Sequence, residues 1–178
     1  MQLKKLFAVG LTAIMMSSLL VGCSGNKTDN SEDVYKIGMI SDTGGVNDES
    51  FNQSTWEGLQ QAQEKYGKDK VQVKYVESSQ EADYTPNIET FVEEDLDLII
   101  GVGYKMAGAI EEASKNYPDV QFAIIDHSYE KQPENVTSLV YEDNTSSYLA
   151  GLIAGKMTKT NNVGFIGGMD ISPINAYK

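Results

Sequence analysis

The chain has 178 residues, a formal net charge of -12 at pH 7 and a hydrophobic content of 40%. This length and composition predict one or two domains with a packed core. The acidic balance argues against nucleic-acid binding, because a phosphate backbone is held by a basic protein face.

The N-terminus has the pattern of an export signal. Two lysines precede an apolar run over residues 6–21, which has the length of a signal peptide and is short for a membrane span. The run ends in Leu20-Val-Gly-Cys23, which resembles the lipobox of bacterial lipoproteins; an ordinary signal peptide with an incidental cysteine is the alternative. We expect a signal peptide over residues 1–22 and a polar tether over residues 23–33. Acyl chains on Cys23, such as palmitate, would anchor the protein to the cell membrane on its extracytoplasmic side.

From Val34 onward, strand-like apolar runs alternate with amphipathic helical ones. The expected strands are residues 35–40, 71–76, 96–102, 121–126, 136–141 and 163–166, and the expected helices are residues 50–66, 87–94, 106–116 and 145–158. Such repeats with short loops predict an α/β fold, a right-handed parallel sheet with helices on both faces. Residues 169–178 look like a loop leading into a helix that the chain does not reach, so we expect a truncated chain.

The junction after the first expected strand is the most informative stretch. The run Ser41-Asp-Thr-Gly-Gly-Val-Asn-Asp-Glu-Ser-Phe-Asn-Gln53 combines a strand end, a glycine-broken loop and a helix start. Ligands of open α/β sheets bind beyond the carboxyl ends of the strands. Asp42, Asn47 and Phe51 would offer a carboxylate, an amide and a ring to a small, flat molecule with polar edges.

Each of these residues also has a structural interpretation. Asp42 could cap a turn, and Asp48 or Ser50 occupies the place of a helix N-cap. On the residues alone, Phe51 is more simply a core residue of an amphipathic helix than a stacking ring. Asn47 and Asn52 look like ordinary loop and helix-start residues.

A second carboxylate is expected at the same edge. Asp126 ends the apolar strand Phe122-Ala-Ile-Ile-Asp126 and could accept hydrogen bonds from two vicinal hydroxyls; a solvated loop acid is the alternative. Tyr104 follows Gly103 at the end of another strand and lies at that edge too. His127, the only histidine, is expected to be an exposed loop residue.

Signals for catalysis or bound cofactors are weak. The chain has no phosphate-binding Gly-x-x-x-x-Gly-Lys-[Ser/Thr] loop, no Gly-x-Ser-x-Gly elbow, no His-Glu-x-x-His and no cysteine pair. No spacing of acids matches an EF-hand calcium loop. We therefore expect no enzyme activity, no metal and no cofactor.

Several segments in order resemble one family. The resemblance lies in five places: the lipobox, the run Ser41–Gln53, Ile99-Ile-Gly-Val-Gly-Tyr104, Phe122–Asp126, and Ser147-Tyr-Leu-Ala-Gly-Leu-Ile-Ala154 with Val163-Gly-Phe-Ile-Gly-Gly168. In these places the chain resembles the basic membrane protein (BMP) lipoproteins. These are purine-nucleoside receptors of the type I periplasmic-binding-protein fold that serve ABC transporters. The resemblance covers the chain from the lipobox to Lys178.

The resemblance implies a nucleoside held between two lobes. Phe51 matches the stacking ring of lobe one, Asp42 and Asn47 match the polar groups near the base, and Asp126 matches a ribose ligand. The ring, acid and lysine of lobe two would lie beyond Lys178. Lobe one would then be complete over residues 34–139, with the crossover and the truncated beginning of lobe two over residues 140–178.

The sequence thus predicts a solute-binding lipoprotein that captures purine nucleosides such as guanosine, inosine or adenosine for an ABC permease, without chemistry on the ligand. The alternatives are the same fold binding a sugar or a small signalling molecule, a nucleoside hydrolase, and a regulatory lipoprotein that binds no ligand.

Overall fold

The computed structural model describes residues 34–178. The expected signal peptide over residues 1–22, the acylation of Cys23 and the tether that ends at Asp33 lie outside the described residues. None of the helices between Val34 and Lys178 combines the length and the apolar character needed to cross a membrane.

Five strands and five α-helices follow Val34, with two short 3-10 turns between them. Their order is β1 (Tyr35–Ile40), α2 (Phe51–Tyr66), β2 (Val71–Val76), η2 (Glu81–Asp83), α3 (Tyr84–Glu93), β3 (Leu98–Val102), η3 (Tyr104–Met106), α4 (Ala107–Asn116), β4 (Gln121–Ile125), β5 (Val136–Leu139), α5 (Asp143–Met157) and α6 (Ser172–Ala176).

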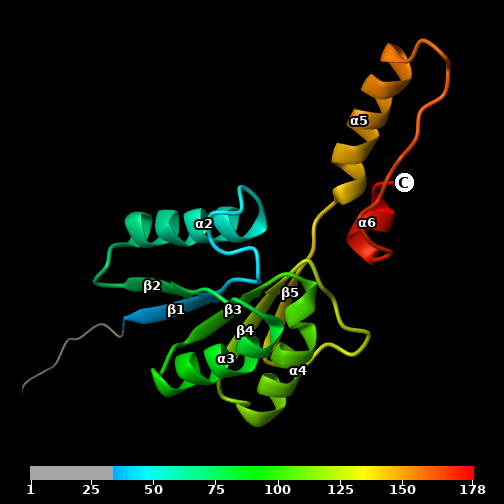
Figure 1. Cartoon of the computed structure of the whole chain (residues 1–178). Coiled ribbons are helices and arrows are strands. Elements are labelled where there is room, and N and C mark those ends of the chain that lie inside the picture. The colour runs from blue at the N-terminus through cyan, green and yellow to red at the C-terminus, as the bar shows by residue number, and fades with distance from the viewer. Residues whose placement is uncertain (1–33) are drawn as a thin grey trace, which may run out of the picture. The chain divides into compact units, whose positions relative to one another are not determined.

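The strands form one parallel sheet with the order β2-β1-β3-β4-β5. Figure 1 shows α2 on one face of this sheet and α3 and α4 on the other. The expected α/β architecture is therefore confirmed. A parallel sheet needs cover on both faces, and the nearly continuous apolar runs of β3 and β4 meet that requirement because both strands are almost fully buried.

The core has one layer on each face of the sheet. Under α3 and α4, Phe91, Ile99 and Phe122 belong to a cluster of fully buried side chains. Under α2, Met39 and Leu59 belong to a second cluster. Within the described part of the chain, every buried apolar residue lies between Met39 and Val136. The helix α5 has no buried residue, although it is apolar over much of its length.

Two expectations for the C-terminal part were wrong. Residues 163–166 form no strand, because an extended apolar run becomes a strand only where a neighbouring strand satisfies its backbone groups, and no such neighbour pairs with it here. A short helix, α6, forms between Ser172 and Ala176, where only a loop was expected. Elsewhere the expected elements are present, with ends displaced by up to three residues.

Candidate functional site

The carboxyl ends of β1, β3 and β4 lie along one edge of the sheet. The three strands are parallel neighbours, and their pairing continues to the strand ends. Asp42 follows β1 by two residues, while Gly103 and Asp126 directly follow β3 and β4. The structure thus brings the predicted acids to one edge, with Tyr104 next to Gly103. Ligands bind at this edge of open α/β sheets.

One oxygen of the Asp42 carboxylate accepts hydrogen bonds within the protein, and the other accepts none from the described residues. Its Oδ1 accepts hydrogen bonds from the backbone N–H of Gly44 at 2.8 Å and from Nδ2 of Asn52 at 2.7 Å. Its Oδ2 faces Gly103, where an added Cβ would lie 3.6 Å away. Gly103 has φ +94°, a conformation that glycine adopts without strain. The missing side chain leaves space next to Oδ2, and Asp42 itself is only half-buried.

The buried side chain of Asn52 forms two hydrogen bonds with Asp42, a role that the sequence analysis did not predict. Its side chain is 1% exposed. Oδ1 of Asn52 accepts from the backbone N–H of Asp42 at 3.1 Å, and Nδ2 donates to both Asp42 and Oδ2 of Asp48, the latter at 2.9 Å. The spacing could have indicated this role, since Asn52 lies one turn beyond Asp48 and ten residues beyond Asp42. Polar residues are common at helix starts, however, so the spacing did not distinguish Asn52 from an ordinary helix-start residue.

The side chain of Asp48 caps the N-terminus of α2, although Ser50 occupies the N-cap position. Its carboxylate accepts from the backbone N–H groups of Ser50, Asn52 and Gln53 at 2.9 to 3.1 Å. Ser50 makes no side-chain capping bond, so of the two expected caps Asp48 is the one used. Burial acts to raise the pKa of Asp48, but these hydrogen bonds outweigh it and hold the pKa below its ordinary value.

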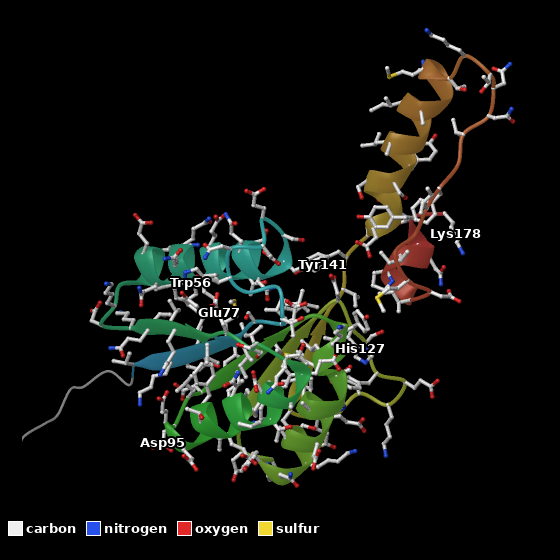
Figure 2. The ribbon with its side chains drawn as sticks, in the orientation of Figure 1. Trp56, Glu77, Asp95, His127, Tyr141 and Lys178 are labelled. Carbon is white, nitrogen blue, oxygen red and sulfur yellow. The ribbon has the colours of Figure 1, made fainter. Side chains whose placement is uncertain are left out.

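Phe51 and Asn47 are open to solvent beside this network. The ring of Phe51, at the first position of α2, is 53% exposed, so the core interpretation of this residue was wrong. Asn47 is exposed in the preceding loop. The loop itself is tied to the neighbouring strand, because Oε1 of Glu77, just after β2, accepts from the backbone N–H of Val46 at 2.8 Å; Figure 2 marks Glu77.

Asp126 occupies the far end of the same edge. Its backbone has φ +59°, and its N–H donates to the carbonyl oxygen of Leu139 at 2.9 Å, which fixes the residue against β5. The side chain is half-buried. Burial raises the pKa of this carboxyl group, and the nearby charge of Asp143 at the start of α5 adds to the shift.

His127, labelled in Figure 2, is half-buried rather than exposed as expected. Its ring meets that of Tyr129 edge-on, with the centroids 4.6 Å apart. Burial lowers the pKa of His127, and a weaker opposing effect comes from the charge of Glu111. The hydroxyl of Tyr129 donates to the carbonyl oxygen of Ala107 at 2.8 Å. These contacts give His127 a packing role.

Tyr104 and Tyr84 complete the edge. The hydroxyl of Tyr104 lies 3.0 Å from Sδ of Met169 and donates to it. The neighbouring Lys105 forms an ion pair with Glu81 at 2.8 Å. Tyr84 is 3% exposed, and its hydroxyl has no hydrogen bond of good geometry. Burial raises the pKa of Tyr84, and the charge of Asp42 raises it further, which places the phenol near that carboxylate; the backbone N–H of Thr43 lies near enough to oppose this shift weakly.

Groups of three or more histidine, cysteine or acidic side chains that could hold a metal ion do not occur among residues 34–178. Hydrogen-bond acceptors and an exposed ring at the strand ends can bind a small organic molecule with donor groups. They do not form a nucleophile and base pair within this edge.

Residues 35–178 match a family model described as Bmp, ABC transporter substrate-binding protein PnrA-like. The chain belongs to this family. The expected relationship to BMP lipoproteins is therefore confirmed, and the family is one of solute-binding proteins, not enzymes.

Similar proteins and solved structures are consistent with membership of this family. A CD4+ T-cell-stimulating antigen of Listeria monocytogenes is 43% identical over 98% of this chain and 51% of its own length. The ABC transporter nucleoside-binding protein BmpA of Lactococcus lactis subsp. cremoris is 39% identical, with the same coverage. An ABC transporter solute-binding protein of Aeropyrum pernix K1 superposes with a TM-score of 0.68 at 26% identity, over 80% of this chain and 40% of that one.

The chain spans about half the length of the curated relatives it matches. Its fold is of the type I periplasmic-binding-protein kind, with the five-stranded parallel sheet described above.

Proposed function

We propose that this chain carries the first lobe and the beginning of the second lobe of an extracytoplasmic lipoprotein that captures a purine nucleoside and delivers it to an ABC permease. Two groups at the carboxyl edge of the sheet carry the proposal: the exposed ring of Phe51, next in sequence to the Asn52 that bonds Asp42, and Oδ2 of Asp42, which accepts no hydrogen bond from the described residues. Membership of the Bmp family and the 39% identity to a protein named as nucleoside-binding support it.

Each residue has a distinct role in this proposal. Phe51 stacks on the base, and Oδ2 of Asp42 accepts a hydrogen bond from a donor on the base edge. Asn47 contributes an amide to the same part of the ligand. Asp126 accepts hydrogen bonds from ribose hydroxyls, and Tyr104 borders the site between the two acids.

These groups alone give weak binding. Stacking on a base contributes about 1–3 kcal/mol, and a hydrogen bond to a charged group about 1.5–3 kcal/mol. Micromolar affinity needs about 8 kcal/mol, before the cost of ordering the ligand. A second lobe that closes over the ligand supplies the difference, by the hinge motion seen in periplasmic binding proteins.

We place lobe one at residues 34–139 and the crossover with the beginning of lobe two at residues 140–178. The buried apolar residues of the described chain end at Val136, three residues before the end of β5, which supports this boundary. The exposed apolar side chains of α5, Leu149 and Ile153 among them, suit a helix that packs within a second lobe.

Anchoring follows from the lipobox. Acylation of Cys23 would hold the protein at the outer side of the cell membrane, since each buried methylene contributes roughly 0.8 kcal/mol and several chains together resist release. The polar residues up to Asp33 would separate the lobe from the bilayer.

Calorimetric titration of the two-lobed protein tests the proposal. Inosine or guanosine should bind with micromolar or better affinity, ribose should not, and Phe51→Ala should weaken the binding. Binding of ribose but no nucleoside would favour a sugar receptor, and no binding at all would favour a regulatory lipoprotein. Release of hypoxanthine from inosine during incubation would instead indicate a nucleoside hydrolase.

A further inference from the structure

We propose that Asn52 is the positioning residue of the binding site: it fixes the carboxylate of Asp42 so that one oxygen stays open to the ligand. The inference rests on the proposed function for its effect on binding. Asn52 itself is 1% exposed and therefore cannot touch a ligand at the strand ends. Any effect it has on binding must act through another group.

The hydrogen bonds of Asn52 define what that group is. An isolated carboxylate on a loop can turn about its side-chain bonds, and either oxygen can face the solvent. In this structure the backbone N–H of Asp42 donates to Oδ1 of Asn52, while Nδ2 of Asn52 donates to Oδ1 of Asp42. The two residues thus bond to each other through both main chain and side chain, which fixes the position and the rotation of the carboxylate together.

The second donor hydrogen of Nδ2 connects this pair to the helix. It is given to Oδ2 of Asp48, whose carboxylate also accepts from the backbone N–H of Ser50, just before α2, and from two N–H groups of the first turn of α2. Hydrogen bonds through Asn52 and Asp48 therefore connect Asp42 to α2, the helix that carries Phe51. The carboxylate and the backbone that carries the ring are thus joined by hydrogen bonds, and fixing the placement of the two groups that would read a base reduces the entropy lost on binding.

Shape and charge both require an amide at position 52. Two carboxylates, those of Asp42 and Asp48, approach the same buried side chain, and only a group with two N–H donors can satisfy both. An aspartate of the same shape would keep the acceptor for the N–H of Asp42 but would add a third carboxylate in place of the donors. Alanine would remove donors and acceptor alike.

The test uses Asn52→Ala, Asp42→Ala and the double variant of the two-lobed protein, titrated with inosine. Asn52→Ala should raise the Kd roughly tenfold, the effect of one charged hydrogen-bond partner. In the Asp42→Ala background the same change should have a much smaller effect, since the carboxylate is gone and Asn52 keeps only its bonds to the backbone N–H of residue 42 and to Asp48. Equal losses in both backgrounds would overturn the proposal, because a general structural role weakens binding regardless of Asp42.

Asn87→Ala is the matched control. Asn87 is also an amide early in a helix; its Nδ2 donates to Oγ of Ser78 at 3.1 Å and to the backbone carbonyl oxygen of Glu77 at 3.4 Å, and it makes no hydrogen bond to either of the two acids that Asn52 bonds. This variant should leave the Kd unchanged. If Asn52→Ala does not fold, the uncharged Asn52→Ser takes its place in the same cycle.

A measurement without nucleoside separates this proposal from the function. The backbone N–H of Gly44 donates to the same oxygen of Asp42 that Asn52 holds. Hydrogen exchange of the Gly44 amide, followed by NMR, should become at least several-fold faster in Asn52→Ala and stay unchanged in Asn87→Ala. Unchanged exchange in Asn52→Ala overturns the positioning role, whereas faster exchange in a protein that binds no nucleoside overturns only the proposed function.

Discussion

Phe51 and Asn52 are sequence neighbours with opposite environments: the ring of Phe51 is 53% exposed, and the amide of Asn52 is 1% exposed. Successive residues of a helix point about 100° apart, so one turn can present a ring to a ligand and bury an amide beneath it. The first turn of α2 thus carries a contact group and its support side by side. This arrangement allows the two roles to be tested separately.

Replacing Phe51 by alanine should weaken nucleoside binding without unfolding the protein. Loss of base stacking, about 1–3 kcal/mol, corresponds to a rise in Kd of roughly 5- to 150-fold. The free energy of unfolding should change little, because the ring has few buried contacts to lose. Calorimetric titration and urea denaturation of the same samples measure the two effects.

Tyr66→Ala is the control for this experiment. Tyr66 ends the same helix and is 56% exposed, but it lies fifteen residues further along α2, at the opposite end from the site. It should leave the Kd unchanged, whereas Phe51→Trp should retain most of the affinity. A Phe51→Ala protein that binds as tightly as the original would contradict the stacking role.

Gly103→Ala should harm both stability and binding. The backbone of Gly103, at φ +94° and ψ 149°, lies in a region that is nearly restricted to glycine, so the variant should lose about 1–3 kcal/mol of stability. The new methyl group would also lie 3.6 Å from Oδ2 of Asp42 and shield the oxygen that we assign to the ligand. Denaturation and titration should show a lower free energy of unfolding and a higher Kd.

Gly108→Ala gives the matched comparison. Gly108 lies in the first turns of α4, and an added Cβ there meets no atom within 4 Å. This change should stabilise the protein by up to about 1 kcal/mol, because alanine favours the helix over glycine. Equal effects of the two substitutions would show that the conformation of Gly103 carries no special cost.

The sequence predicted the sheet well because each strand has its own local signal. The run Leu98–Val102 is apolar throughout and the run Val71–Val76 alternates, and both patterns decide burial without reference to the rest of the chain. The run Val163–Ile166 looks equally strand-like, yet pairing is a property of two segments. A pattern in one segment does not supply the partner.

The candidate site was predicted in position but not in detail. Asp42 and Asp126 follow apolar runs, so their common edge follows from parallel topology. The burial of Asn52 and the exposure of Phe51 depend on the path of the loop before α2, which Glu77, just after β2, helps to fix through the backbone N–H of Val46. Contacts between distant segments of this kind leave no periodic trace in the sequence.

Tyr84→Phe should leave the free energy of unfolding unchanged or raise it by up to about 1 kcal/mol. The hydroxyl of Tyr84 is buried and has no hydrogen bond of good geometry; the donor near it is the backbone N–H of Thr43, so most of the desolvation cost of the hydroxyl is not offset. Removing the oxygen removes that cost and leaves the ring in its apolar cluster with Ile88 and Phe91. Urea denaturation measures the difference.

The contrasting variant is Tyr129→Phe. The hydroxyl of Tyr129 donates to the carbonyl oxygen of Ala107 at 2.8 Å, so its loss should cost about 0.5–1.5 kcal/mol. If Tyr84→Phe is destabilising by the same amount, the phenol of Tyr84 has a partner in solution, such as a buried water, and the expectation is wrong.

Asp126→Asn should stabilise the protein at neutral pH while impairing binding. Burial, with a contribution from Asp143, raises the pKa of Asp126 above its ordinary value of 3.8. The folded state therefore holds this proton more tightly than the unfolded state, and stability falls as the pH rises from 3.8 through the folded-state pKa. Asparagine cannot ionise, so the variant should avoid this loss at pH 7 and match the original protein below pH 3.8.

Thermal unfolding between about pH 3 and pH 8 measures the stability of both proteins, and titration with inosine at neutral pH measures the binding. The Kd should rise about tenfold or more, since the carboxylate that would accept from two ribose hydroxyls becomes an amide with one acceptor oxygen. Higher stability together with weaker binding would show that Asp126 contributes to ligand binding and lowers the stability of the folded state. Lower stability at neutral pH would contradict the raised pKa, and unchanged affinity would remove Asp126 from the site.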